Sequence, residues 1–429
     1  MDYKRIELKN GAGLNIISTG KFKTGFLSLN FIRPLSRGEN AKNALLVQVL
    51  RRGCEGLETQ QKINAELSKN YGMRLEPIVR KRGECQVFGF YCTMINNSFA
   101  FEGENIFKNA VTIMEKLMFE PLIADGAFLE EYVESEKRNL KNYIAAQIND
   151  KISYSIKRAS EEMCACEPYA LSAYGEAEDV DGITPRELYE HYRLIIKEAK
   201  TEAFYVGSED EDTLKAAFVH LRALSKRPAD TLPKPVVTGD VKEVRRVTEE
   251  LKVAQGKLAI GCRTGITEGD ALYPALVLAN ALFGGTPVSK LFMNVREKLS
   301  LCYYVKSITD KLKGVMIIAA GIENENLDVT LKEIEAQLSA LKRGEITEDE
   351  LTAARAALRT SINSTLDSGA QTEDYYLTKT INGDTSSPLD LLLRLDAVTT
   401  DEIIAAANTI KYDTIYFLKG TEGGADDEQ

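Results

Sequence analysis

The sequence predicts an α+β protein of two homologous lobes, each a mainly antiparallel sheet covered by helices, joined by a linker into a clamshell. Three observations predict this fold. Residues 25–53 align without a gap on residues 256–284, at an offset of 231. Runs of β-branched and aromatic residues alternate with helical Leu/Ala/Glu/Lys patterns in both halves. A charged stretch with three prolines lies between the halves, at residues 225–245.

The repeat matches in the order of its elements as well as in its residues. GFLSLNFIRPLSRGENAKNALLVQVLRRG corresponds to GKLAIGCRTGITEGDALYPALVLANALFG. In both copies a strand-like stretch, residues 26–31 or 258–262, leads through a polar turn to an apolar-rich helix. That helix is predicted to end at Gly53 in the first copy and at Gly284-Gly285 in the second.

Both halves then continue in parallel. Each has a second helix (59–70; 288–299), a strand pair around Gly83 or Gly314, two further helices (104–119 and 127–149; 326–342 and 347–365), and a final helix and strand. We therefore predict a first lobe over 1–224, a linker over 225–245 and a second lobe over 246–420. The Gly-rich acidic tail, 421–429, is predicted to be disordered.

Composition narrows the classes of function. Apolar residues make up 44% of the chain and charged residues 28%, with a net charge of −10. This is an ordinary globular composition, and without a basic stripe it argues against nucleic acid and anionic membranes as partners. The charged N-terminus resembles no signal peptide and no stretch is long enough to span a bilayer, so a cytoplasmic location is expected.

Seven scattered cysteines favour reduced, mostly buried thiols over a disulfide framework. Cys164 and Cys166 form a single C-x-C, with neither a second cysteine pair nor a nearby histidine. Because structural zinc needs four clustered ligands, we expect no metal there.

Residues 280–307, NALFGGTPVSKLFMNVREKLSLCYYVKS, resemble the C-terminal-domain signature of the insulinase/pitrilysin (inverzincin) zinc peptidases, N-x-x-x-G-G…S-x-L-F…R-E-K…L-x-Y. The chain resembles the non-catalytic YmfF-like branch of this family and is similar to the α subunit of mitochondrial processing peptidase. The resemblance covers nearly the whole chain and implies the metallopeptidase-like fold, a zinc-bearing homologous partner subunit and a peptide substrate. A homodimer is the alternative assembly. Members of this branch are also linked to peptide or elongation-factor P maturation.

The family's zinc motif is lost in this chain. Active members carry H-x-x-E-H on a helix of the first lobe, and these positions fall on Ala44, Val47 and Gln48. The third ligand, seven residues after Glu136, falls on Tyr143. The resemblance therefore implies no catalytic residue and no metal in this chain, with zinc held by the partner.

The chain contains only two histidines, His191 and His220. They lie 29 residues apart, which is too far for a displaced copy of the motif. We expect each to be a partly exposed helical residue without a role in metal binding.

The resemblance implies that Arg296 and Tyr303 bind substrate by reaching the peptide held at the partner's zinc. In the simpler interpretation, Arg296 is a surface helix residue paired with a glutamate and Tyr303 is a strand residue. Gly284-Gly285 stands where related subunits carry a substrate loop, and a tight turn explains it equally well.

Two functions follow. The first is an inactive subunit, a pseudo-peptidase on its own, that completes the chamber of a heterodimeric zinc metallopeptidase. The alternative is a peptide-binding or scaffold protein with no role in proteolysis. A third, an independent enzyme, finds no Ser/His/Asp, Cys/His or cofactor motif to support it.

Overall fold

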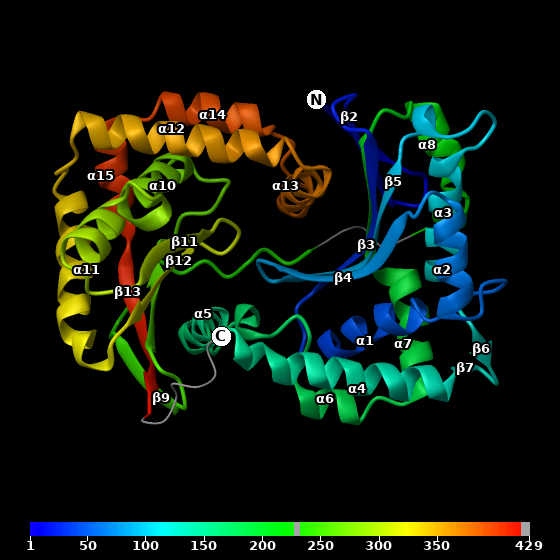
Figure 1. The fold of residues 1–429 in the computed structure, drawn as a ribbon, viewed down its shortest axis with the longest axis horizontal. Coiled ribbons are helices and arrows are strands. Elements are labelled where there is room, and N and C mark those ends of the chain that lie inside the picture. The colour runs from blue at the N-terminus through cyan, green and yellow to red at the C-terminus, as the bar shows by residue number, and fades with distance from the viewer. Residues whose placement is uncertain (227–231, 422–429) are drawn as a thin grey trace. The chain divides into compact units, whose positions relative to one another are not determined.

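Two mixed β-sheets organise the chain in the computed structural model, which describes residues 1–226 and 232–421 (Figure 1). The α+β class is as predicted. Residues 422–429 of the expected disordered tail and residues 227–231 of the expected linker lie outside the described residues. The chain divides into two compact units. The first unit comprises Met1–Ala145, Leu171–Pro233 and Thr365–Thr385, and the second comprises Ala146–Ala170, Lys234–Ser364 and Ser386–Gln429.

The sheet of the first unit has the strand order β1-β2-β8-β3-β5-β4, in which only β2 and β8 run parallel. Its strands are β1 (Asp2–Glu7), β2 (Gly13–Ser18), β3 (Thr24–Pro34), β4 (Arg74–Arg82), β5 (Cys85–Ile95) and β8 (Lys200–Gly207), and a small hairpin pairs β6 (Ile123–Ala124) with β7 (Ala127–Phe128).

The sheet of the second unit has the order β11-β12-β10-β13-β9, in which only β13 and β9 run parallel. Its strands are β9 (Arg245–Leu251), β10 (Gly256–Arg263), β11 (Tyr304–Asp310), β12 (Val315–Ile322) and β13 (Lys411–Gly420). This order repeats β4-β5-β3-β8-β2 strand for strand and direction for direction, which confirms the duplication. Gly83 and Gly314, 231 residues apart, both have positive φ, of 55° and 69°, at equivalent hairpin turns.

The helices also repeat. The first unit holds α1 (Asn40–Leu50), α2 (Gln60–Lys69), α3 (Ile106–Phe119), α4 (Glu130–Ala146), α6 (Ala177–Asp181), α7 (Pro185–Glu198), α8 (Glu211–Ala217), α9 (Val219–Ala223) and α13 (Gly369–Asn382). The second holds α5 (Lys151–Met163), α10 (Tyr273–Asn280), α11 (Leu327–Lys342), α12 (Glu348–Thr365), α14 (Pro388–Asp396) and α15 (Thr400–Thr409), together with the π-helical segments η4 (Ala281–Gly285) and η5 (Leu291–Lys298).

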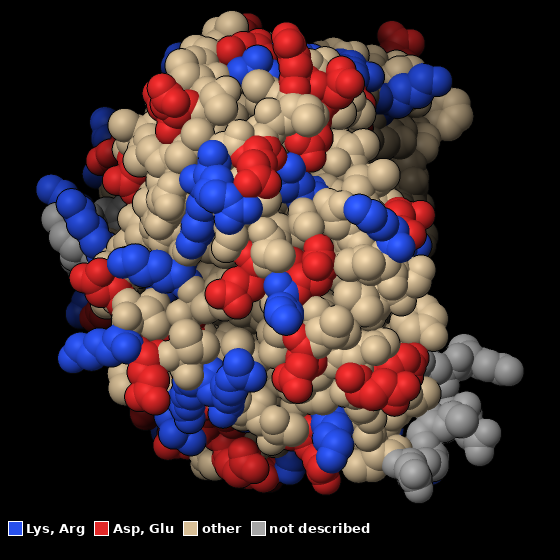
Figure 2. All heavy atoms as spheres, turned by 90° about the vertical axis from the view of Figure 1, so that its left-hand side faces the viewer, with Lys and Arg blue, Asp and Glu red and all other residues tan. Residues whose placement is uncertain are grey.

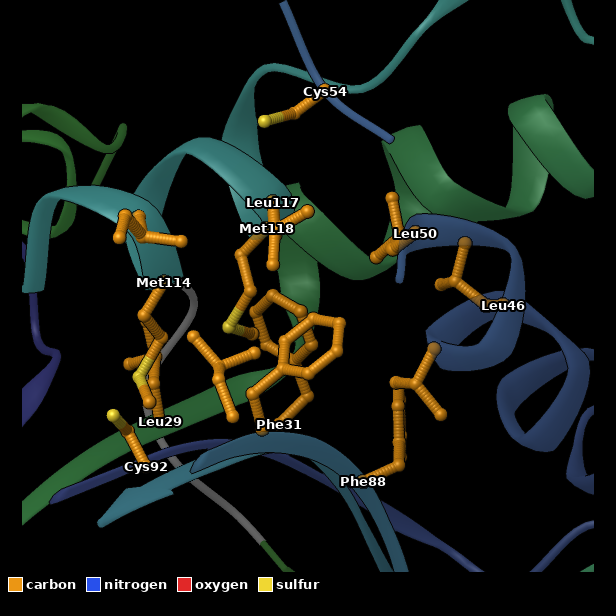
Figure 3. Close-up of a cluster of buried hydrophobic side chains, with 14 of the residues drawn as sticks. Leu29, Phe31, Leu46, Leu50, Cys54, Phe88, Cys92, Met114, Leu117 and Met118 are labelled. Atoms are coloured by element: carbon orange, nitrogen blue, oxygen red, sulfur yellow. The ribbon is translucent and has the colours of Figure 1, made fainter. Parts of the chain in front are cut away.

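The main core of the first unit lies between one face of its sheet and the helices α1 and α3. Leu29 and Phe31 of β3 point into this core beside Met114 of α3 and Leu46 of α1 (Figure 3). All four side chains are buried. Apolar burial on this scale is the dominant stabilising contribution to the fold.

The opposite face of the same sheet is covered by α13, a helix from the C-terminal half of the chain. Phe26 and Ile32 of β3 share a buried cluster there with Tyr376 and Leu377 of α13. Both faces of β3 are therefore buried, and the face toward α13 also carries the polar residues Ser28 and Asn30.

A buried carboxylate fixes α13 in this place. Glu373 accepts a hydrogen bond from Ser28 Oγ at 2.7 Å and pairs with Arg80 Nη1 at 2.8 Å. Its side chain is fully buried, so these partners are needed to offset the desolvation of its charge.

The second sheet is covered in the same way by α5, a helix from the N-terminal half. Met163 of α5 lies against Gly261 of β10, where a Cβ atom would come within 2.9 Å of its sulfur. Just beyond α5, Glu167 pairs with Arg263 Nη2 at 2.6 Å and also with Lys313. Gly261 thus permits α5 to approach β10 closely, and the ion pairs of Glu167 stabilise this packing.

Each unit therefore contains one helix from the other half of the sequence. The predicted division into lobes over 1–224 and 246–420 does not include this exchange. That division assigns α5 to the first lobe and α13 to the second, whereas their contacts assign them the other way. The physical reason is that each sheet has two apolar faces, and the helices of its own half cover only one of them.

Candidate functional site

Arg296 lies on η5, a π-helical segment, with 42% of its side chain exposed. Its guanidinium lies 4.7 Å from the ring centre of Phe292 and 3.6 Å from Glu297 Oε1. The pairing with a neighbouring glutamate that the simpler interpretation expects is therefore present. An exposed pair at this distance contributes little free energy, so it does not prevent Arg296 from binding another group.

A tight turn carries the chain from Arg296 to Tyr303. The N–H of Ser300 donates to Arg296 O and the N–H of Leu301 donates to Val295 O, both at 3.0 Å. Ser300 has a φ of 51°, a left-handed conformation that is strained for a residue other than glycine. Strained residues and π-helical segments both concentrate at functional sites.

Tyr303 stands at the end of this turn, immediately before β11. Its N–H donates to Gly321 O at 3.0 Å, which anchors the backbone to β12, while 65% of the residue is exposed. Arg296 and Tyr303 thus combine a fixed backbone with accessible polar ends. Val288, Met293 and Leu299 in the same segment are exposed apolar residues, which an extended peptide could contact.

The two glycines before this segment have a structural reason. A Cβ atom at Gly284 would lie 2.8 Å from Leu291 Cδ1 and from Ser307 Oγ, and one at Gly285 would lie 2.6 Å from Asn280 Nδ2. Close packing against η5 and β11 therefore accounts for Gly284, and close packing against Asn280 of α10 accounts for Gly285. The α-helix predicted over 288–299 is corrected to the π-helical segment Leu291–Lys298, since the backbone hydrogen bonds here close wider turns.

The positions matched to the zinc motif do not suit a metal. Ala44 and Val47 are fully buried in α1, where nine of eleven residues are buried, and neither side chain carries a lone pair. Gln48 is partly buried on the same helix. Tyr143 of α4 is 50% exposed and its ring lies 4.6 Å from that of Tyr174.

These residues therefore do not fit the zinc ion of active family members. Nearby, Glu136 pairs with Arg52 at 3.1 Å. Within residues 1–226 and 232–421, no group of three or more His, Cys, Asp or Glu side chains is placed to hold a metal ion.

The two histidines differ from each other. The prediction that His191 is partly exposed is wrong, because it is 8% exposed on the buried stripe of α7. Its Nε2 lies 2.6 Å from Asn43 Oδ1, and Asn43 Nδ2 donates to Gln86 Oε1 at 2.7 Å. His220 is partly exposed as predicted, with Nε2 placed 2.6 Å from Glu120 Oε1.

The cysteines agree with the prediction. All seven are free, and all but Cys166 are buried. Cys164 is buried whereas Cys166 is exposed, so the C-x-C pair shows two different environments.

Surface charge is mixed. Figure 2 shows lysine and arginine interspersed with aspartate and glutamate over one face, without a broad area of one sign among the residues described. In the part of the chain that the structure describes, no helix is both long and apolar enough to cross a membrane.

The sequence of this chain matches a protein-family model and the sequence of a known relative. Residues 182–358 match the family model described as "Peptidase M16 inactive domain". The chain is 35% identical over 423 residues to the "Probable inactive metalloprotease YmfF" of Bacillus subtilis, covering 98% of this chain and 99% of that one.

Solved structures agree with these matches. A conserved protein from Enterococcus faecalis superposes with a TM-score of 0.88 at 28% identity, covering 98% of this chain and 99% of that one. A peptidase M16 inactive domain from Pseudomonas fluorescens, at 18% identity over 98% of this chain and 99% of its own, shares the fold with a TM-score of 0.79. These matches confirm the resemblance to the zinc peptidases.

Proposed function

Because the chain belongs to the M16 peptidase family, we propose that it is the non-catalytic subunit of a heterodimeric zinc metallopeptidase. It completes the chamber and binds peptide for a homologous, zinc-bearing partner. The observation that carries the proposal is a contrast between two sites. The matched zinc positions Ala44 and Val47 are apolar and buried. In contrast, Arg296 and Tyr303 are exposed, and hydrogen bonds fix the backbone of the turn that joins them.

The chemistry of the second site suits a peptide. The planar guanidinium of Arg296 has forked donors that can hold carbonyl oxygens of an extended chain. The phenol of Tyr303 can donate a hydrogen bond to an oxygen that becomes negative when a peptide bond is attacked. Neither group needs a metal in this chain, so cleavage would depend on the partner. Maturation of a peptide or of elongation factor P is the corresponding cellular role.

The second candidate is a peptide-binding or scaffold protein with no role in proteolysis. The contact between Arg296 and Glu297 supports it, because a paired surface arginine needs no substrate to explain it. A chain of complex III from Candida albicans shares the fold with a TM-score of 0.74 at 16% identity, which shows that this architecture also occurs within a larger assembly.

Substitution of Arg296 separates the two candidates. In a mixture with the zinc-bearing homologue, Arg296→Ala should lower peptide cleavage by about ten- to a hundredfold, because a hydrogen bond from a charged group is lost. Tyr303→Phe should lower cleavage by about a hundredfold or more, because a hydrogen bond to the developing negative oxygen is lost. Assembly, followed by size-exclusion chromatography, should be unchanged.

Arg343→Ala is the matched control. Arg343 is also an exposed arginine of the second unit, paired with Glu345 at 2.7 Å, so its loss should leave cleavage unchanged. Equal turnover of Arg296→Ala and the unmodified chain would remove the role proposed for Arg296 and favour the scaffold.

A further inference from the structure

The first sheet has two edge strands, β1 and β4. The outer edge of β4 lies opposite β5, with which β4 pairs from Arg74↔Thr93 to Arg82↔Cys85. An edge strand offers unpaired backbone groups, to which an extended peptide can add as a further strand. The state of these groups therefore decides whether this edge of the sheet can bind a peptide through its main chain.

Pro77 identifies the outward groups of β4. Proline has no N–H, and within a sheet its nitrogen lies on the side away from the neighbouring strand. Backbone groups alternate in direction along an antiparallel strand. Leu75, Val79 and Lys81 have the same parity as Pro77, so their carbonyl groups also point away from β5.

Each of these three carbonyl groups already accepts a hydrogen bond from a side chain. Arg51 Nε donates to Leu75 O at 3.0 Å and the hydroxyl of Tyr174 donates to Val79 O at 3.2 Å. Arg82 Nη1 donates to Lys81 O at 2.7 Å. An incoming strand would meet three occupied acceptors, and at Pro77 it would find no donor.

The side chains that donate to these carbonyl groups lie near the positions matched to the zinc motif. Arg51 directly follows α1, the helix that carries Ala44 and Val47. Tyr174 packs against Tyr143, the residue at the matched third ligand position, with ring centres 4.6 Å apart. Tyr143 thus supports one of the hydrogen-bond donors that cover the edge.

We propose that Arg51, Pro77 and Tyr174 close the outer edge of β4 to strand addition. This edge of the first sheet then does not capture an extended peptide by main-chain pairing. This inference goes beyond the proposed function, because it concerns β4 alone and holds whether or not Arg296 and Tyr303 bind a peptide.

A triple variant of the full chain, Arg51→Met, Pro77→Thr and Tyr174→Phe, tests the closure. The probe is a fluorescein-labelled peptide of alternating Thr and Val with a Lys at each end. We expect the variant to bind it at least about tenfold more tightly than the unmodified chain, since backbone groups able to pair become available. Hydrogen–deuterium exchange should then show peptide-induced protection over residues 74–82 in the variant only.

Arg355→Met with Tyr132→Phe is the matched control. These side chains also donate to backbone carbonyl groups, Val398 O and Glu58 O, both at 2.8 Å, but away from β4. The control should bind the probe no better than the unmodified chain.

Equal affinity of the triple variant and the unmodified chain would overturn the closure. So would peptide-induced protection of residues 74–82 in the unmodified chain, a measurement that needs no variant to fold. If circular dichroism shows that the triple variant is unfolded, that exchange measurement decides alone. Self-association of a folded triple variant through residues 74–82 would support an opened edge.

Discussion

Residues 1–233, produced without the rest of the chain, should fail to fold cooperatively and should recover when a peptide of residues 365–385 is added. The peptide contains α13, which belongs to the first unit although it comes from the other half of the sequence. A fragment cut in the connector therefore loses one complete covering layer of its sheet.

The expected loss is large compared with the stability of a domain. Without α13, Tyr376 and Leu377 no longer cover the sheet, at about 1.5–3 kcal/mol for each apolar side chain. Phe26 and Ile32 of β3 lose their cover as well, at the same cost for each side chain, and Arg80 loses its ion pair with Glu373. Together these approach or exceed the roughly 5–15 kcal/mol by which native proteins are stable.

Circular dichroism and urea unfolding of the fragment, with and without the peptide, measure this effect. A peptide carrying Leu377→Asp is the control, because it keeps the length and the other contacts but places a charge in the buried cluster. Cooperative unfolding of residues 1–233 alone would contradict the assignment of α13 to the first unit.

The unfolding free energy should fall by about 3 kcal/mol as the pH is lowered from 6.5 to 4, through the protonation of His191. Burial is the main cause that lowers the pKa of His191 from 6.5 to about 4. Lys42 and Arg33 act in the same direction and Glu39 opposes them. In the folded chain the ring stays largely neutral until the pH approaches 4, whereas in the unfolded chain it binds a proton below pH 6.5.

The unfolded state therefore binds more protons below pH 6.5, so stability is fully present above that pH and is lost toward pH 4. At roughly 1.4 kcal/mol for each pH unit, the difference in pKa corresponds to the stated loss. Urea unfolding of the unmodified chain and of His191→Gln at several pH values measures it. His191→Gln should lack this component, while His220→Gln serves as the second-histidine control. Parallel pH profiles for the unmodified chain and His191→Gln would show that His191 does not titrate in this way.

The repeat predicted the matching elements of the two halves and their hairpin turns, because these are local consequences of the sequence. Gly83 and Gly314 are an example, since a tight hairpin requires a positive φ in each copy. The exchange of α5 and α13 was not predictable in the same way. An amphipathic pattern shows that a helix buries one face, but not which sheet receives it.

The environment of His191 could have been predicted. It lies between Leu188 and Ile195 with the spacing of one buried helical stripe, so the pattern itself places it inside. The exposure of Arg296 matches the simpler interpretation of the sequence, whereas the π-helical segment and the positive φ of Ser300 had no signal in the sequence. The covered edge of β4 had only one sequence signal, Pro77 within a strand-like run.

Metal content and peptide cleavage test the central claim most directly. The purified chain should contain no stoichiometric zinc and should not cleave a peptide library, because Ala44, Val47 and Tyr143 do not provide the family's zinc site. Mixed with the homologue that carries an intact zinc motif, it should give cleavage that depends on both chains. Stoichiometric zinc and cleavage by the purified chain alone would contradict the account.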